Sequence, residues 1–504
     1  MDTVSRPDSE RSEHERVRRD KLARIREAGG DPYPPEFRPT ASHAELHLRH
    51  ASLPSGEETG DIVRIAGRVL SRRTSGKLCF LDLVDGTGER IQIFADLGGL
   101  GESAFTRLTE WVDLGDIIGV EGHVRRTKRG ELSVQPSTWT MLSKALRPLP
   151  EKWHGLTDVE TRYRHRHLDL ISNPEVRDTF IKRSRAIAAI RHLLDQEGFL
   201  EVETPMLHAI PGGAAARPFM THHNALDLEL HLRISPELYL KRLVVGGLER
   251  VYEINRSFRN EGVSTRHNPE FTMIEVYQAY ADYRDMMTLT ERLVSAAALA
   301  ACGTTRIPCG QHPSGVLDLA SPWPRRTMRA QVDLFLRDLG LEPDGLDLEA
   351  RVDLLRAHGG SVPRDVTPGT VLAALFDCFD HKLLDPVFIT DFPVEVSPLA
   401  KRHRDDPALT ERFEAFVLGR ELANAFSELN DPLDQRQRFE AQAAAKASGD
   451  DEAHAVDEDY LSALEQGMPP TGGLGIGIDR LAMLLCDASS IRDVILFPLL
   501  RPRA

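Results

Sequence analysis

The stretch FRNEGVSTRHNPEFTMIE, residues 258–275, decides how the rest of the chain is interpreted. It overlaps two apolar, strand-like segments, ERVYEINRSF and PEFTMIEVYQAY, and between them Gly262 and Asn268 favour turns. We therefore predict two strands joined by a long loop. A loop of this length in a compact domain is usually functional, and a salt-bridged surface hairpin is the alternative.

The loop contains the types of side chain that bind a nucleotide. Guanidinium groups hold phosphate oxygens in pairs, a carboxylate accepts a hydrogen bond from the exocyclic amine of adenine, and an aromatic face stacks on a purine. The chain has neither a GxxxxGK[ST] phosphate loop nor a GxGxxG motif that opens a βαβ unit. The sequence therefore predicts an ATP-binding loop of another type.

A second glycine-rich stretch, TGGLGIGIDRLAMLL at residues 471–485, lies near the other end of the chain. Its glycines allow a close approach of the backbone, and Arg480 then begins an apolar helix. Taken alone, the stretch is also typical of a tight strand-to-helix junction. Together with an ATP-binding loop, it favours an arginine that holds the nucleotide from the opposite side.

An earlier region has the pattern of a small barrel. Between residues 61 and 141, short β-type runs alternate with turn signals such as DGTGE and KRGE. This pattern favours an oligonucleotide-binding (OB) fold, which stacks unpaired bases on aromatic residues of its open face. Phe80, near Arg72, Arg73 and Lys77, suits that use, and a place in the barrel core is the alternative.

The remaining segments complete the organisation. Residues 9–28 predict a basic helix that either packs through Val17, Leu22 and Ile25 or contacts nucleic acid. A longer helix is expected over residues 174–198. The later strands and helices show no regular βαβ alternation, so we predict an α+β fold with an antiparallel sheet, preceded by an all-β OB-fold barrel.

Length and composition limit the function without naming it. A chain of 504 residues exceeds the size of one hydrophobic core, so two or three domains are expected. The chain has no apolar run of about 18 residues and a charged start, which predicts a cytoplasmic protein without a membrane span. Five cysteines without a CxxC pair disfavour disulfides and zinc ligation. The net charge of −14 disfavours a uniformly basic nucleic-acid-binding protein, but it allows local basic patches.

Three motifs together carry a family resemblance. FLEVETP, ending at Pro205, the FRNE and RHNPEF loop, and GLGIGIDR resemble, in order and spacing, the signatures of class II aminoacyl-tRNA synthetases. EVSPLAKRHRDDP and GRELANAFSELNDP are similar to the lysine-specific branch of that family. The resemblance covers essentially the whole chain. It implies ATP-dependent activation of L-lysine to lysyl-adenylate and transfer to the 3′ end of tRNA(Lys).

The resemblance also implies a domain order and an assembly. We expect four parts: an N-terminal helical lead over 1–55, an OB-fold anticodon-binding domain over 56–145, a linker over 146–160 and a class II catalytic domain over 161–504. A homodimer packed around Pro205 is implied as well. In the barrel, the positions that contact an anticodon in the family are Arg73, Phe80, Gln92 and Glu131.

The contacts with ATP are carried over from the family residue by residue. They place Glu261 and Asn268 at adenine, Phe271 beneath it, Arg259 at the α-phosphate, and Arg266, His267 and Arg480 at the β- and γ-phosphates. Arg259 and Arg480 would also be catalytic, because they stabilise the charge that develops during transfer. Mg²⁺ would bridge the phosphates through Glu414 and Glu421, seven residues apart on a predicted strand. Without the resemblance, two glutamates at that spacing are typical of a solvated face.

The same carry-over gives a lysine pocket. It consists of Gly213 and Glu237 near the α-amino group, with Glu275, Tyr277, Asn424 and Glu428 around the side chain. A buried carboxylate at Glu428 selects a cation, since breaking a buried ion pair costs about 3–5 kcal/mol. A chain one methylene shorter is rejected less strongly, by about 10- to 200-fold.

Three rival interpretations are weaker. An aspartyl- or asparaginyl-tRNA synthetase shares the barrel and the motifs, but Glu428 and Tyr277 disfavour its substrates. A nucleic-acid-binding protein with an inactive ligase domain does not need the phosphate-binding residues, all of which are present. A ligase that attaches lysine to a protein or lipid does not need the barrel.

Overall fold

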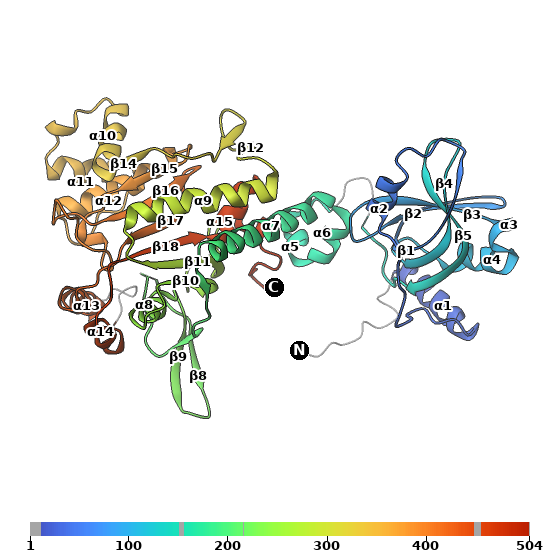
Figure 1. Cartoon of the computed structure of the whole chain (residues 1–504), viewed down its shortest axis with the longest axis horizontal. Coiled ribbons are helices and arrows are strands. Elements are labelled where there is room, and N and C mark those ends of the chain that lie inside the picture. Colours follow the sequence, from blue (N-terminus) through green and yellow to red (C-terminus); the bar gives the residue numbers. More distant parts are fainter. Residues whose placement is uncertain (1–11, 151–155, 215, 448–454, 503–504) are drawn as a thin grey trace. The chain divides into compact units, whose positions relative to one another are not determined.

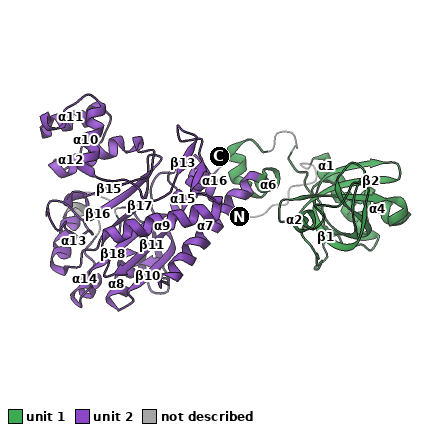
Figure 2. Ribbon diagram, turned by 45° about the horizontal axis from the view of Figure 1, so that its top comes forward, with its two compact units in different colours: residues 1–174 green, residues 175–504 purple. Residues whose placement is uncertain are grey.

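The computed structural model of the chain describes residues 12–150, 156–214, 216–447 and 455–502. It divides into two compact units, residues 1–174 and 175–504 (Figure 2). Part of the expected linker lies outside the described residues. Among the helices in the described ranges, none is long and apolar enough to cross a membrane.

The first unit is built around a closed five-stranded barrel with the strand order β1-β2-β3-β5-β4 (Figure 1). The strands coincide with the five β-type runs of the sequence: β1 Glu58–Ser75, β2 Leu78–Val84, β3 Arg90–Asp96, β4 Ile117–Arg126 and β5 Leu132–Ser143. Alternate residues such as Leu81 and Leu83 of β2 fill the interior. The predicted all-β barrel is confirmed.

Three short helices lie against the barrel: α2 His43–Arg49, α3 Leu97–Leu100 and α4 Glu102–Trp111. Two more, α5 Val159–Arg164 and α6 Arg166–Ser172, come at the end of this unit. The predicted basic helix is α1, Glu13–Glu27. Its Ile25 is buried and Leu22 is half-buried, but Val17 is 44% exposed, so only part of the predicted apolar face packs. Arg18 is buried instead and donates hydrogen bonds to backbone carbonyl groups beside the barrel. A basic residue therefore helps to anchor this helix.

The second unit contains an eight-stranded sheet with the order β14-β15-β16-β17-β18-β11-β10-β6. Its strands are β6 Leu200–Glu201, β10 Arg250–Phe258, β11 Glu270–Ala279, β14 Arg325–Thr327, β15 Val387–Thr390, β16 Arg412–Val417, β17 Arg420–Ser427 and β18 Thr471–Gly477. The pairs at the two edges are parallel and all the inner pairs are antiparallel. The predicted α+β fold with an antiparallel sheet is confirmed.

Smaller elements complete this unit. The short strands are β7 Leu207–His208, β8 Met220–His223, β9 Leu228–Leu232, β12 Arg306–Pro308 and β13 Val316–Asp318. The helices besides those of the main core are α8 Glu237–Val245, α10 Met328–Asp338, α11 Leu348–Ala357, α12 Pro368–Phe379, α13 Pro432–Ala447, α14 Glu458–Glu465 and α16 Ile491–Val494. Helices α10, α11 and α12 enclose a core of their own.

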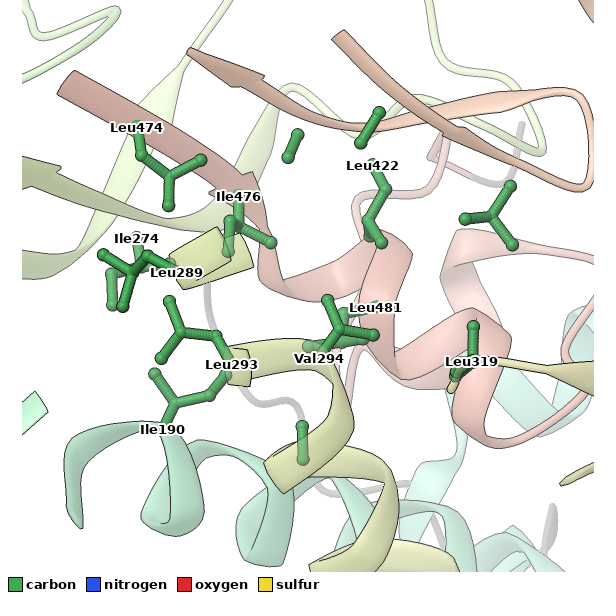
Figure 3. Packing of buried hydrophobic residues seen from close by; sticks show 14 of the residues in the cluster. Ile190, Ile274, Leu289, Leu293, Val294, Leu319, Leu422, Leu474, Ile476 and Leu481 are labelled. Carbon is green, nitrogen blue, oxygen red and sulfur yellow. The ribbon is translucent and has the colours of Figure 1, made fainter. Parts of the chain in front are cut away.

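The main core lies between the sheet and three helices, α7 Pro174–Gln196, α9 Tyr283–Cys302 and α15 Ile478–Leu485. Figure 3 shows Ile190 of α7 and Leu293 of α9 packed near Ile274 of β11. Side chains alternate along a strand, so a residue next to Ile274 points to the opposite face of the sheet. Glu275 therefore belongs to the face that carries the candidate site.

Candidate active site

A cavity of about 400 Å³ brings two of the three sequence motifs together, the loop at residues 258–275 and the glycine-rich stretch at residues 471–485. Its walls come from β11, β17 and β18, from the loop between β10 and β11, and from the start of α8. All fifteen residues assigned above to ATP, Mg²⁺ or lysine line it: Gly213, Glu237, Arg259, Glu261, Arg266, His267, Asn268, Phe271, Glu275, Tyr277, Glu414, Glu421, Asn424, Glu428 and Arg480. Their individual contacts with ligands stay predictions.

The loop between β10 and β11 begins at Arg259, because Phe258 and Glu270 form the last pair of the two strands. The guanidinium carbon of Arg259 lies 5.1 Å from the centre of the Phe271 ring. Burial lowers the pKa of Arg259, and its Nε has no hydrogen-bond partner among the described residues. A buried cation with an unused donor beside an aromatic face can accept a phosphate next to a stacked base.

The tip of this loop is ordered by Ser264. Its hydroxyl oxygen accepts hydrogen bonds from the backbone N–H groups of Arg266 and His267, at 3.1 and 3.0 Å. The same hydroxyl lies 3.1 Å from Nδ1 of His267. Burial and the positive charge of Arg480 lower the pKa of His267, which favours the neutral imidazole.

Glu261 and Asn268, both predicted to contact adenine, differ in their surroundings. Glu261 is exposed at the cavity wall. The amide of Asn268 is buried, donates to the carbonyl oxygen of Glu270 at 2.5 Å and accepts from the backbone N–H of Leu499 at 3.3 Å. Asn268 therefore holds the loop in place.

Glu414 and Glu421 lie on two strands rather than on the single strand predicted. The turn between β16 and β17 consists of Leu418 and Gly419, with φ of 52° and 63°. Two successive residues with positive φ form a tight turn whose twist matches the right-handed twist of the flanking strands. Phe416 pairs with Glu421 and is two residues from Glu414, so both carboxylates lie on the same face of the sheet.

One extra residue in β17, Leu422, shifts the pairing of this hairpin. Beyond this β-bulge, Glu414 pairs with Asn424 and Arg412 pairs with Phe426. Asn424 and Phe426 therefore share a face with the two glutamates and line the same cavity.

Two arginines balance the charge of the glutamate pair. Arg412 donates to Oε1 of Glu414 at 2.6 Å, and Arg480 lies 3.2 Å from Oε2 of Glu421. Burial raises the pKa of Glu414 to about 8 despite Arg412, and the nearby charge of Glu421 adds to the rise. For Glu421 the opposing effect of burial is overcome by Arg480 and Arg412, and the pKa is lowered. In the described ranges no three metal-ligating side chains cluster, so the chain would offer a metal this pair of carboxylates.

A second acidic group lies at the other end of the cavity. Glu275 accepts hydrogen bonds from two hydroxyl groups, Ser235 Oγ at 2.7 Å and Tyr277 Oη at 3.1 Å. Burial, reinforced by the negative charge of Glu237, raises the pKa of Glu275 to about 8. The pKa of this carboxyl group therefore lies about one unit above neutral pH.

Glu428 follows β17 and is 1% exposed. One of its oxygens forms an ion pair with Nζ of Lys241, which also donates to Oε1 of Glu237 at 2.6 Å. The other oxygen, Oε1, has no hydrogen-bond partner in the part of the chain that the structure describes. Burial raises the pKa of Glu428 well above its usual range, although Lys241 opposes the rise. A buried carboxylate oxygen without a donor indicates a position for a ligand.

Lys241 is a site residue that the sequence analysis missed. It lies on α8, four residues after Glu237, and none of its side chain is exposed. A lysine on an amphipathic helix is normally a surface residue. The one signal in the sequence was its spacing from Glu237, which places both side chains on one face of the helix.

Two glycines make room for the acidic groups. A Cβ at Gly473 of β18 would overlap the carboxylate of Glu428 and approach the Tyr277 ring to 2.7 Å. Gly213 has a φ of 87°, and a Cβ there would lie 2.9 Å from the hydroxyl of Ser235. The glycine-rich stretch therefore serves the cavity as well as the strand-to-helix junction.

The barrel presents a row of side chains across three strands. Arg73 pairs with Phe80, and Phe80 pairs with Phe94, so the three side chains lie on one face. Phe80 is half-buried and packs edge-on against Phe94, with ring centres 5.3 Å apart. Arg125 lies 4.8 Å from the Phe94 ring. Phe94 and Arg125 were not predicted, although Phe94 follows the period-two pattern of RIQIFAD.

The other two residues assigned to the anticodon differ in exposure. Gln92 is 9% exposed, and its side-chain oxygen accepts a hydrogen bond from Ser133 at 3.0 Å. Glu131, just before β5, is exposed. The structure therefore offers Glu131 to a partner more readily than Gln92.

The chain was compared with known proteins. Residues 158–501 match the family described as tRNA synthetases class II (D, K and N), and residues 63–142 match the OB-fold nucleic acid binding domain. A protein of Synechococcus sp. (strain CC9605) named Lysine--tRNA ligase is 56% identical over 98% of this chain and 98% of its own length. A protein of the same name from Carboxydothermus hydrogenoformans is 54% identical over 97% of this chain and 98% of its own length.

Proposed function

The chain belongs to the class II tRNA synthetases of the D, K and N group, and on that premise we propose that it activates L-lysine with ATP and transfers it to tRNA(Lys). The family match covers more than half of the chain, and relatives named Lysine--tRNA ligase match nearly all of it. The resemblance found in the sequence alone is confirmed at the level of the family.

One observation carries the choice of lysine: the buried oxygen Oε1 of Glu428 has no donor among the described residues. A cationic side-chain tip would supply that donor and the missing positive charge. An aspartate side chain would instead bring a third negative charge close to Glu428 and Glu275. An asparagine amide would leave the charge of Glu428 unbalanced. The pocket therefore suits an amino acid with an ammonium tip.

The first step needs no nucleophilic side chain. The lysine carboxylate attacks the α-phosphorus of ATP in line, the bond to the bridging oxygen breaks, and pyrophosphate leaves. Arg259 is suited to hold the α-phosphate beside an adenine stacked on Phe271. Arg480 would hold the phosphates from the opposite wall. Catalysis then consists of positioning and of charge stabilisation by these arginines.

Glu414 and Glu421 would hold Mg²⁺. Carboxylate oxygens are the donors this ion prefers, and the two face one cavity from adjacent strands. The bound ion would neutralise charge on the β- and γ-phosphates. The role of the protein is to keep the two carboxylates on one side of the hairpin.

The second step transfers lysine from the adenylate to tRNA. The terminal ribose hydroxyl attacks the carbonyl carbon of lysyl-adenylate, and AMP leaves. The barrel row of Arg73, Phe80 and Phe94 would stack and hold unpaired anticodon bases. Glu131 and Gln92 would add contacts with the anticodon, although Gln92 is largely buried. Because charged tRNA is consumed in protein synthesis, we place the enzyme in the cytoplasm.

We also propose that the chain forms a homodimer through the segment around Pro205. Strand β6 lies at the edge of the large sheet, where its outer side has no partner strand among the residues that the structure describes. Four apolar side chains in this segment are 38–51% exposed: Leu200, Met206, Leu207 and Ile210. Exposed apolar groups in one short segment favour a protein interface. Leu207→Asp should yield monomers in analytical ultracentrifugation.

Exchange of labelled pyrophosphate into ATP, measured with each of the twenty amino acids, tests the proposed function. We expect the signal with lysine to exceed every other, with ornithine as the strongest analogue outside the set. Absence of exchange with lysine, or a larger signal with aspartate or asparagine, would contradict the proposal.

A further inference from the structure

Lys241 is the one cation in contact with the acids at the amino-acid end of the cavity, within the described residues. Its Nζ lies 2.6 Å from Glu237 and also pairs with Glu428. Its side chain has no exposed surface, and the Phe426 ring lies 5.4 Å from Nζ. The ammonium group is therefore held by two carboxylates at the wall of the pocket.

The groups that face this pair come from every element packed around it. They are Glu237 on α8, Glu275 and Tyr277 on β11, and Asp457 and Tyr460 at the start of α14. Asp457 also lines the cavity, but it pairs with Arg242, which balances its charge. Three carboxylates, Glu237, Glu275 and Glu428, remain for the amino acid.

The charges in the pocket can be counted. When the amino acid is bound and Glu275 has released its proton, the three carboxylates carry three negative charges, and Lys241 supplies one positive charge, which leaves two negative charges. L-Lysine carries two ammonium groups, and its carboxylate faces the phosphates in the proposed reaction. Buried charges are tolerated only when they are balanced, so this count matches a diamino acid.

We propose that Lys241 is a specificity-determining positioning residue, which pairs with Glu428 and sets the pocket charge to match the two ammonium groups of the amino acid. This inference rests on the proposed function. Lys241 acts through Glu428 and does not itself take part in the reaction. Its position four residues after Glu237 lets one helix supply both the α-amino partner and the balancing cation.

Removal of Lys241 has a consequence that depends on pH. Without its positive charge, Glu428 faces Glu237 and Glu275 alone, and burial keeps it protonated at neutral pH. The ε-ammonium of lysine must then displace that proton. Below its pKa, the ionised fraction of an acid falls about tenfold per pH unit. The penalty on lysine binding therefore decreases as pH rises.

The test compares Lys241→Met with the wild-type enzyme by lysine-dependent pyrophosphate exchange from pH 6.5 to 9. We expect the KM for lysine to rise at least about tenfold at pH 7, and the ratio of variant to wild-type KM to fall about tenfold per pH unit. The ratio removes the titration of lysine itself. Lys241→Gln provides a second neutral variant should Lys241→Met fold poorly, and Lys241→Arg should restore a flat ratio.

Lys144→Met is the matched control, because Lys144 is equally buried between two acids in the barrel. It should leave the KM ratio near one at every pH. A KM ratio for the neutral Lys241 variants that stays near one, or is raised equally at all pH values, would overturn the inference while the proposed function stands. No lysine-dependent exchange by the wild-type enzyme would instead overturn the proposed function and, with it, this inference.

Discussion

Each unit of the protein contains a fully buried lysine between two acids, but only one of these clusters has an open position. In the barrel, Lys144 lies 2.6 Å from Asp113 and 2.8 Å from Asp116. The remaining oxygens of these acids accept from Lys21 at 2.6 Å and from the backbone of Ala145 at 2.8 Å. That cluster is closed.

The cluster at Lys241 also consists of one lysine between two acids, but it is not closed. Glu428 forms an ion pair with Lys241 through one oxygen, and its other oxygen has no donor within the described ranges. Lys241 and Lys144 thus show that a buried ion pair does not by itself indicate function. An unsatisfied oxygen facing a cavity is what distinguishes a binding site from a structural anchor.

Glu428→Gln should give the largest effect, because it changes the open cluster itself. It removes the anion for the substrate and leaves Lys241 with Glu237 alone, at a cost of about 3–5 kcal/mol. We expect kcat/KM for lysine in pyrophosphate exchange to fall by roughly several hundred- to several thousand-fold. The exposed Glu465→Gln is the control. An unaltered preference for lysine would remove Glu428 from its proposed role.

Lys144→Met should act on stability instead of activity. It leaves two buried acids that keep their other donors, so we expect a loss of about 3 kcal/mol in the free energy of unfolding of the barrel. Denaturant unfolding followed by barrel tryptophan fluorescence measures this loss. Lysine-dependent exchange should stay at the wild-type level. A large loss of exchange without unfolding would show that the two clusters are not functionally distinct.

Phe80→Ala should have a smaller effect, confined to tRNA. Stacking of one base on an aromatic ring contributes about 1–3 kcal/mol, so KM for tRNA in aminoacylation should rise roughly 5- to 150-fold. Lysine-dependent exchange should be unaffected. Leu48→Ala, at an apolar residue that is 80% exposed, is the control. Equal losses in both assays, or a destabilised barrel, would place Phe80 in the core.

Stability should depend on pH through Glu275, and its effect is spread over more than three pH units. The folded, ligand-free protein holds a proton on Glu275 up to about pH 8, whereas the usual value for this group is 4.5. Because the folded state binds the extra proton, this group makes the free energy of unfolding decrease as pH rises from about 4.5 to about 8. Denaturant unfolding at pH 5.5, 7 and 8.5 measures the slope. Glu275→Gln should make the slope less steep, while Glu414 and Glu428 still contribute in the same direction. An unchanged slope would contradict the assignment.

The sequence predicted elements where a local pattern is strong. The barrel strands follow a period of two, and the nucleotide loop has a composition that a simple connection does not explain. The sequence-based prediction was wrong where the structure depends on pairing between strands. The turn at Leu418 and Gly419 lacks the usual Asn-Gly signal, so Glu414 and Glu421 were placed on one strand.

Burial was the other property that the sequence did not reveal. Lys241 is buried because Glu428, which is remote in sequence, lies against α8. Gln92 was expected on the open face of the barrel, but its bond to Ser133 depends on the parallel pairing of β3 and β5. A periodic pattern gives the face of an element but not the element that covers it.

The bulge at Leu422 makes the local geometry of β17 part of the chemistry. Because side chains alternate, a regular hairpin that kept every residue but lost the bulge would leave Glu421 beside Glu414 and turn Asn424 and Phe426 to the hydrophobic face. Such a change would separate the phosphate half of the cavity from its amino-acid half while preserving every side chain proposed to work there. The backbone at one buried leucine therefore keeps the two halves of the cavity on the same side of the sheet.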